Sequence, residues 1–398
     1  MSGKTSIWIA GNENVFVVKR KSTFSGKLLP AEQELEIYKA VPGERVQIIR
    51  PDGKGNYSVR LPPGTYFVTA AKPASPVQVD AALAKPIHPE MLDSSVCDVG
   101  EVRGEAAADL GQPVKKSGRS TGLTYGHVIV IGATVTVNFT AGRTARFVNQ
   151  IITGKMGSPG DSGSLLLDED NNALGLLFAG SDLVTVYHPI SEITEQLAVR
   201  VTKEKYPWPA VYYRQNRYRE LEEICKNAIP ALLSLPNVVG AGIGHKTRQG
   251  FNSGRACITV LVSKKIPLDD LPEEERIPSQ INGVLTDVME TGELAAVTGT
   301  PAAGNDPGRT GRMRPARPGI SIGHYLVTAG TLGAVVYDAR TSEPLILSNN
   351  HVLANSSNGS DGRAKLGDPI LQPGAGDGGS REHDVIGRLH RFYPLHFL

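Results

Sequence analysis

One short stretch of this sequence brings together the residue types that nucleophilic catalysis requires. The run Ser158-Pro-Gly-Asp-Ser-Gly-Ser places Asp161 and Ser162 in a glycine-lined turn, directly before an apolar run that begins at Leu165. A hydroxyl nucleophile needs such a turn, because backbone N–H groups must converge on the carbonyl oxygen that it attacks. The turn therefore predicts that Ser162 is a nucleophile.

A serine of this kind is inert without a general base. Of the nine histidines, His351 has the matching context, because the strand-like run Pro344-Leu-Ile-Leu-Ser-Asn-Asn precedes it. We predict that His351 is the base. The others are expected to be structural or solvated: His88, His127, His188, His245, His324, His383, His390 and His396.

A catalytic histidine in turn needs a buried carboxylate, which fixes its tautomer and stabilises the imidazolium. Asp80 begins the small apolar run Asp80-Ala-Ala-Leu-Ala, and Asp384 in His-Asp-Val-Ile is a rival. We choose Asp80 as the orienting residue.

The three contexts resemble those of one family. Gly160-Asp-Ser-Gly resembles the GDSG motif of bacterial-type trypsin-like (chymotrypsin-fold) serine peptidases, and the runs at His351 and Asp80 resemble that family's His-bearing turn and Asp-led strand. It is not the GxSxG elbow, because position 164 is Ser. The resemblance implies a Ser162, His351 and Asp80 triad, an oxyanion hole from the amides of Gly160 and Ser162, and neither metal nor cofactor.

The same resemblance places Met156 at the base of the primary specificity pocket and Gly180 on a wall, which implies an apolar substrate side chain. Lys155 keeps acidic substrates open as an alternative. The family often has Ser or Thr beside the orienting Asp, where this chain has Phe178. That departure bears on how Asp80 is tuned, not on whether the triad exists.

The triad residues occur in the order Asp, Ser, His. Moving the chain ends converts this order into the His, Asp, Ser order of trypsin-like enzymes, but not into the subtilisin or α/β-hydrolase order. Residues 218–398 followed by 77–200 would reproduce the family's arrangement, so the resemblance implies a circular permutation. The two parts either close within one chain, which we favour, or complete each other between copies by domain swapping.

Short alternating runs broken by Gly, Pro and Asn predict a mainly β protein. The expected fold is a permuted chymotrypsin-like double β-barrel with an added N-terminal β-sandwich-like module and a small α+β domain. The expected segments are a prealbumin-like all-β module at 1–74, the part with Asp80 and Ser162 (second barrel and closing helix) at 75–201, a linker at 202–217, the α+β domain at 218–296, a linker at 297–317, and the part with His351 (first barrel) at 318–398.

Composition limits the partners. The 398 residues carry a formal charge of +2 with mixed signs along the chain, which favours neither nucleic acid nor an anionic membrane as a partner. The three widely spaced cysteines and the lack of a long apolar run predict a reduced, cytoplasmic, soluble protein. The expected partner is a peptide or protein substrate, with a swapped homo-oligomer as a possibility.

Two other functions remain open. A catalytically silent scaffold that binds peptides or supports assembly would keep the barrels without turnover. An autoprocessing peptidase would cut itself in the 297–317 linker, which contains Arg309, Arg312, Arg314 and Arg317.

Overall fold

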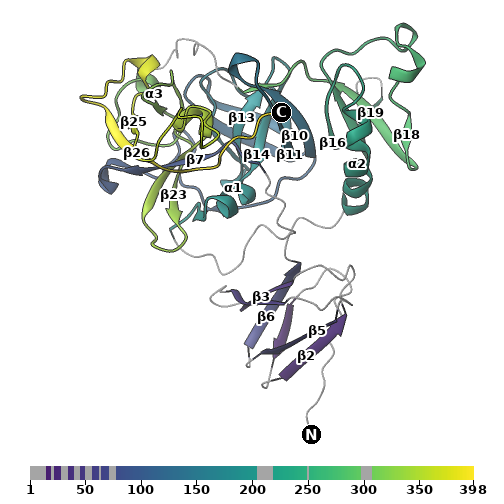
Figure 1. Cartoon of the computed structure of the whole chain (residues 1–398), viewed down its shortest axis with the longest axis horizontal. Helices are drawn as coiled ribbons and strands as arrows, with labels where there is room; N and C mark the ends of the chain where they lie inside the picture. Colours follow the sequence, from purple (N-terminus) through teal and green to yellow (C-terminus); the bar gives the residue numbers. More distant parts are fainter. Residues whose placement is uncertain are drawn as a thin grey trace. The chain divides into compact units, whose positions relative to one another are not determined.

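The computed structural model describes residues 78–203, 218–248, 251–296 and 307–398, and the backbone of the strands before residue 71 (Figure 1). The chain divides into two compact units. One comprises residues 1–76 and 204–216, and the other comprises 77–203 and 217–398.

The first unit is built from short antiparallel strands. β1 (Val15–Val18), β6 (Gly64–Ala70), β3 (Leu35–Lys39) and β4 (Arg45–Ile49) form one sheet in that order, and β2 (Ser22–Lys27) pairs with β5 (Asn56–Leu61). The Gly-containing turn at 52–55, which contributed to the prealbumin-like resemblance, lies outside the described residues.

In the second unit, the sheet formed by the strands before and after Ser162 closes on itself. Its strands run in the order β11, β14, β13, β12, β9, β10, and a further β10–β11 pairing joins the two ends into a barrel. The apolar runs of β12 and β13 are buried along nearly their whole length, as a barrel interior requires. The bounds are β9 (Pro113–Gly118), β10 (Gly122–Asn138), β11 (Thr144–Gly154), β12 (Leu165–Leu167), β13 (Asn172–Gly180) and β14 (Val184–Pro189), with α1 (Ile190–Gln196) after β14.

A second sheet gathers strands from both ends of this unit's sequence. Its order is β15 (Val199–Arg200), β23 (Ala334–Asp338), β24 (Pro344–Ser348), β7 (Ala82–Pro86), β26 (Val385–Phe392), β25 (Pro369–Leu371), β21 (Ser321–His324) and β22 (Gly330–Thr331). Bonds from Gly319 N to Leu332 O and from Leu332 N to Ile320 O extend the β21–β22 pairing, and the next residue, Gly333, donates its N–H to Leu347 O, so the chain passes directly from the last strand of this order to β23 near its start. The protein is thus mainly β, with two barrel-like sheets.

Strand β7 lies in the sheet of the His351 part, although the sequence interpretation grouped it with Ser162. It pairs antiparallel with β24 on one edge and with β26 on the other, within one chain. β7 and β26 are labelled side by side in Figure 1. Ala82, Leu83 and Ala84 have no exposed surface. A small apolar strand that is buried and paired on both edges suits this central position.

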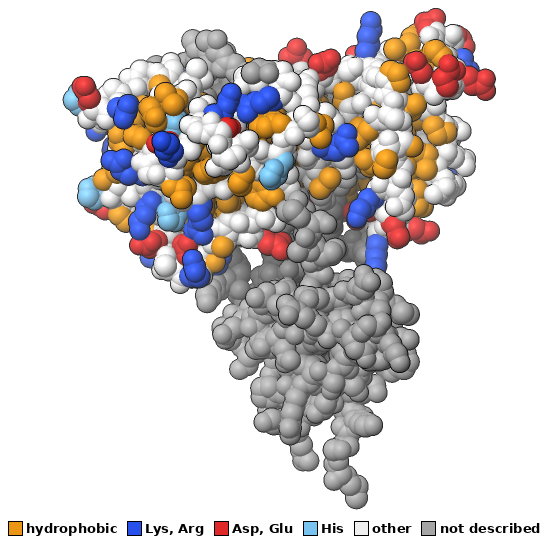
Figure 2. Space-filling model, viewed as in Figure 1, with side chains coloured by type: hydrophobic (Ala, Val, Ile, Leu, Met, Phe, Trp, Pro, Cys, Tyr) orange, Lys and Arg blue, Asp and Glu red, His pale blue; other side chains and the backbone are white. Residues whose placement is uncertain are grey.

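The segment expected to be a small α+β domain continues the Ser162 barrel's sheet. β10 pairs with β16 (Val238–Arg248), which is followed across the sheet by β17 (Phe251–Val262), β19 (Val284–Glu290) and β18 (Gln280–Ile281). α2 (Arg219–Leu232) packs its apolar side on these strands. The acidic turn at 267–278 gathers red side chains at the far end of this segment (Figure 2).

Part of the predicted 297–317 linker is packed rather than free. α3 (Pro307–Thr310) carries Arg309, which is buried and donates to Ser117 Oγ, Gly118 O and Gly319 O.

The apolar core explains how the two barrels hold together, because Leu83, Leu165 and Leu347, which come from both of them, belong to one buried cluster.

All three cysteines, Cys97, Cys225 and Cys257, are buried, and none of them forms a disulfide. Within the described residues, no helix has both the length and the apolar character needed to cross a membrane.

Candidate active site

Asp80 and His351 form a buried pair from distant parts of the chain. The Nδ1–H of His351 donates to Asp80 Oδ2 at 2.5 Å, and the His351 backbone N–H donates to Asp80 Oδ1 at 3.0 Å. Asn349 Nδ2 also donates to the Asp80 carbonyl at 2.7 Å. The structure thus brings the predicted orienting carboxylate to the predicted base.

His351 lies in α4 (Asn350–Leu353), which begins one residue after the end of β24. Because its Nδ1 donates to the Asp80 carboxylate, the neutral ring carries its lone pair on Nε2. Nε2 is buried and has no hydrogen-bond partner among the described residues. The Phe139 ring lies edge-on to the imidazole, with 6.4 Å between ring centroids. This arrangement gives the histidine a basic nitrogen in an apolar surrounding.

The turn that carries Ser162 lies against the strands that lead to His351. Thr331 N donates to Ser162 O at 2.8 Å, and a Cβ on Gly163 would clash with Ser348 Oγ and Thr331 O. Gly163 also has φ of +96°, which favours glycine. Ser348 stands three residues before His351, so this contact holds the predicted nucleophile's turn beside the base.

The loop with the predicted oxyanion donors is fixed from both sides. Thr331 Oγ1 donates to Gly160 O at 2.9 Å, and Asp161 N donates to Ser158 O at 2.9 Å. Gly160 has φ of +98°, which a residue with a side chain would resist. These bonds fix the peptide planes next to the amides of Gly160 and Ser162.

Lys116 and Asp161 form a fully buried ion pair that the sequence did not single out. The Nζ to Oδ2 distance is 3.2 Å, and both side chains have no exposed surface. Asp161 also accepts the amides of Ser120 at 2.8 Å and Ser158 at 3.0 Å. Burial lowers the pKa of Lys116, and Asp161 opposes that shift. The pair anchors the residue that precedes Ser162.

His188 is a second histidine beside Asp80, also missed from sequence. Its Nε2 accepts the Asp80 backbone N–H at 3.0 Å, and its ring stacks on Phe178 at 3.7 Å. Complete burial lowers the pKa of His188 to about 3, with the Asp80 charge opposing the shift. Phe178, where the family often has Ser or Thr, therefore supports a neutral histidine at this point.

The rival carboxylate lies elsewhere. Asp384 accepts the Ser380 N–H at 2.9 Å and faces Arg312 at 3.7 Å. Its interactions are those of a loop anchor.

A small pocket of about 160 Å³ lies between the turn before Ser162 and the end of β13. Gly180 lines it and Met156 does not. The Met156 side chain is buried in the core, where its sulfur accepts the Tyr187 hydroxyl at 3.7 Å. The lining residues are Lys155, Gly157, Ser158, Pro159, Leu177, Ala179, Gly180, Ser181, Thr185, Ala295 and Ala296.

The chain's own strand β20 (Ala295–Ala296) runs along this pocket. Ala296 pairs with Ala179 and Ala295 with Gly180 in antiparallel register on β13. The segment before it is anchored by the bond from Asn138 N to Leu294 O at 2.8 Å. An internal segment therefore occupies the edge of β13 beside Ser162.

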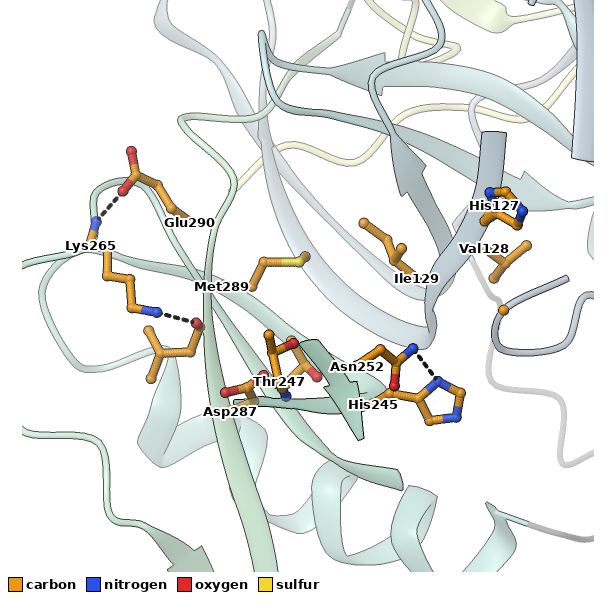
Figure 3. Close-up of a pocket in the computed structure, with 13 residues that line it drawn as sticks. His127, Val128, Ile129, His245, Thr247, Asn252, Lys265, Asp287, Met289 and Glu290 are labelled. Atoms are coloured by element: carbon orange, nitrogen blue, oxygen red, sulfur yellow. Dashed lines mark hydrogen bonds between the residues drawn. The ribbon is translucent and has the colours of Figure 1, made fainter. Parts of the chain in front are cut away.

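A larger hollow of about 820 Å³ lies between β10 and the β16–β17–β19 sheet (Figure 3). Its polar side chains bond to one another and to nearby backbone: Asn252 Nδ2 lies 3.2 Å from His245 Nδ1, and Asp287 accepts the Thr247 N–H at 2.9 Å. None of the predicted triad residues lines it. Among the described residues, no group of three His, Cys, Asp or Glu side chains could hold a metal ion.

No protein-family model matches the chain, and no curated protein matches it. Solved structures with a similar fold include Cellulomonas bogoriensis chymotrypsin, at 22% identity over 41% of this chain and 83% of that one, with a TM-score of 0.23. Nocardiopsis protease (NAPase) has 18% identity over 41% and 87%, with a TM-score of 0.22. Thermobifida fusca protease A has 17% identity over 48% and 96%, with a TM-score of 0.22. At these scores the likeness does not bear on this chain's activity.

Proposed function

We propose that this protein is a serine endopeptidase that hydrolyses peptide bonds through an acyl-enzyme, with Ser162, His351 and Asp80 as its triad. One observation carries the proposal. The buried Asp80 carboxylate orients the His351 ring, and the strands leading to that histidine bind the Ser162 turn through Thr331. A serine peptidase requires this combination of a glycine-lined serine, a base and an orienting carboxylate.

In the proposed reaction, His351 Nε2 removes the Ser162 proton as Ser162 Oγ attacks the carbonyl carbon of the scissile bond. The amides of Gly160 and Ser162 stabilise the oxyanion, and Asp80 stabilises the imidazolium. His351 then gives its proton to the leaving amine. Water, activated by the same histidine, hydrolyses the acyl-enzyme and restores Ser162.

The permuted order is part of the proposal. The pairing of β7 between β24 and β26 within one chain supports closure of the two parts intramolecularly. A domain-swapped oligomer would use the same pairings between copies, and sedimentation of the purified protein distinguishes the two arrangements.

Labelling with a fluorophosphonate probe tests the triad. Ser162→Ala and His351→Ala should abolish labelling, and peptide mapping should find the probe on Ser162. The matched control is His383→Ala, which removes an exposed histidine imidazole away from the triad. If the folded protein does not react, or reacts equally in the Ser162→Ala variant, the peptidase proposal fails and the silent scaffold becomes the better reading.

A second candidate, self-processing, is favoured by β20. Addition of an extended segment to a strand edge is how many proteins bind peptides. Ala295 and Ala296 pair in this way with β13, beside Ser162 and along the small pocket. We propose that the chain is its own first substrate and that the cut falls after β20, within residues 297–306. The buried Arg309 is a poor site for the cut.

Intact mass spectrometry tests self-processing. Wild-type protein incubated after purification should yield fragments that end within 297–306, whereas Ser162→Ala protein should keep its full mass. A wild-type chain that stays intact and still labels at Ser162 contradicts self-processing but leaves the peptidase proposal standing.

A further inference from the structure

The small pocket beside Ser162 has features that restrict the side chain it can hold. If the protein is the peptidase proposed above, this pocket receives the side chain on the acyl side of the cleaved bond. We infer that it selects small, uncharged side chains such as those of alanine and valine, and that Thr185 sets the size limit.

The position of the pocket follows from backbone contacts. Gly163 N donates to Leu177 O at 2.8 Å, and Leu177 N donates to Ser164 O at 2.9 Å, so β13 runs directly alongside the residues after Ser162. The turn with Gly157 and Ser158 forms the other wall. A residue bonded to Ser162 through its carbonyl therefore has this space beside it.

The available space is small. The volume of about 160 Å³ suits one amino-acid side chain, because pockets that hold a whole drug-sized ligand measure roughly 300 to 1,000 Å³. Gly157 and Gly180 leave room because they lack side chains, but Leu177 and Thr185 fill the space behind them. A Cβ on Gly157 would lie 2.8 Å from Leu177 Cδ1 and 3.6 Å from Thr185 Cγ2.

Thr185 cannot readily turn out of the pocket. Its Oγ1 accepts the backbone N–H groups of Met156 at 2.9 Å and of Gly157 at 3.2 Å, and the residue is buried. A rotation about χ1 would leave both buried amides without this partner, which is costly. The methyl group is therefore held toward Gly157.

The charges near the pocket disfavour ionised side chains. Lys155 is the charged residue in the lining, and its Nζ donates to Ser181 O at 2.7 Å and lies 3.4 Å from the exposed Asp182. None of the described residues that line the pocket carries a carboxylate. A lysine or arginine side chain would lose water there without gaining a counter-ion, and the Lys155 amine is already paired at the rim.

Peptidyl diphenyl phosphonates that differ only in the residue at phosphorus test the inference on the full chain. Ser162 Oγ forms a bond to phosphorus and phenoxide leaves, so the labelling rate reports how well each side chain fits. Ala and Val probes should react at least about tenfold faster than Phe, Lys and Glu probes, since a misfitting group in such a pocket costs about 10- to 200-fold. The ratios of the labelling rates, and not the absolute rates, test the inference, because any slowing of labelling by β20 affects all the probes alike.

Two variants sharpen the test. Thr185→Ser keeps the hydroxyl that holds Met156 and Gly157 but removes the methyl group, so it should raise the Leu-to-Ala rate ratio about tenfold. Lys155→Met should leave the Leu-to-Ala ratio unchanged, because neither of these probe side chains is charged. Equal rates for all probes, a preference for Phe or Lys, or a Glu preference that Lys155→Met abolishes would overturn the inference.

The proposed function and this inference fail in different ways. If the simple fluorophosphonate does not label Ser162, the peptidase proposal is refuted. The pocket is then tested by titrating the protein with tetrapeptides that end in the same residues, where a lack of preference for Ala or Val ends refutes the size limit independently of catalysis.

Discussion

The buried ion pair beneath the nucleophile turn leads to a sharp prediction. Lys116→Met should destabilise the unit that holds the triad by about 3–5 kcal/mol, the usual cost of leaving one partner of a buried pair uncompensated. The lower end is expected, because Asp161 keeps the amides of Ser120 and Ser158 as hydrogen-bond donors. Lys115→Met is the matched control, since within the described part of the chain the Lys115 amine donates to the exposed Glu169 carbonyl at 3.1 Å and to no carboxylate. It should change stability by less than about 0.5 kcal/mol.

Urea unfolding followed by circular dichroism measures the change. Tryptophan fluorescence would not report the unfolding of this unit, because both tryptophans, Trp8 and Trp208, belong to the other unit. The fluorophosphonate labelling rate of Ser162 should also fall in folded Lys116→Met protein, because the turn loses its anchor. The double variant with Asp161→Asn should cost less than the sum of the two single changes. A Lys116→Met protein as stable as the Lys115→Met control would refute this account of the turn.

Three further changes test the surroundings of the site. His188 has a pKa lowered to about 3. The unfolded chain therefore binds more protons than the folded state between about pH 3 and 6.5, and stability rises with pH over that range. His188→Gln should flatten the rise of the unfolding free energy with pH in a series of urea titrations, and an unchanged slope would contradict this account of His188. Burial raises the pKa of Glu105 to about 7. The folded state therefore binds more protons than the unfolded chain above about pH 4.5, and stability falls as pH rises toward 7. Glu105→Gln should raise the melting temperature at pH 8 but not at pH 4, and an equal effect at both would count against the raised pKa of Glu105. Thr331→Val removes the donor to Gly160 O. It should lower kcat for a peptide substrate about tenfold or more with little change in KM, as expected for loss of oxyanion stabilisation, and Thr331→Ser should restore kcat. A change confined to KM would argue against a role for Thr331 in the oxyanion loop.

Much of the site could be read from local sequence because its chemistry is local. The Gly160 to Gly163 turn needs glycines at positive φ and an apolar strand after it, and both leave a signature. The strand before His351 and the small apolar run after Asp80 are equally plain. The sequence also predicted the mainly β character, since alternating short runs with turn residues cannot form long helices.

The missed features depend on residues far apart in the chain. His188, Lys116 and Thr331 look ordinary in their own segments, and they matter because folding places them against Asp80, Asp161 and Gly160. The predicted role of Met156 comes from counting back from Ser162, which does not tell which way a side chain points. Its neighbour Gly157 lines the pocket while Met156 packs inward.

The sequence by itself determined which residue types were available for catalysis and the turns that could carry them, because backbone conformation and residue chemistry are encoded within a few positions. Only the tertiary structure decided that β7 sits between β24 and β26 and that β20 covers the edge of β13. Strand pairing joins hydrogen-bonding edges regardless of their separation in sequence, so no local pattern specifies the partner.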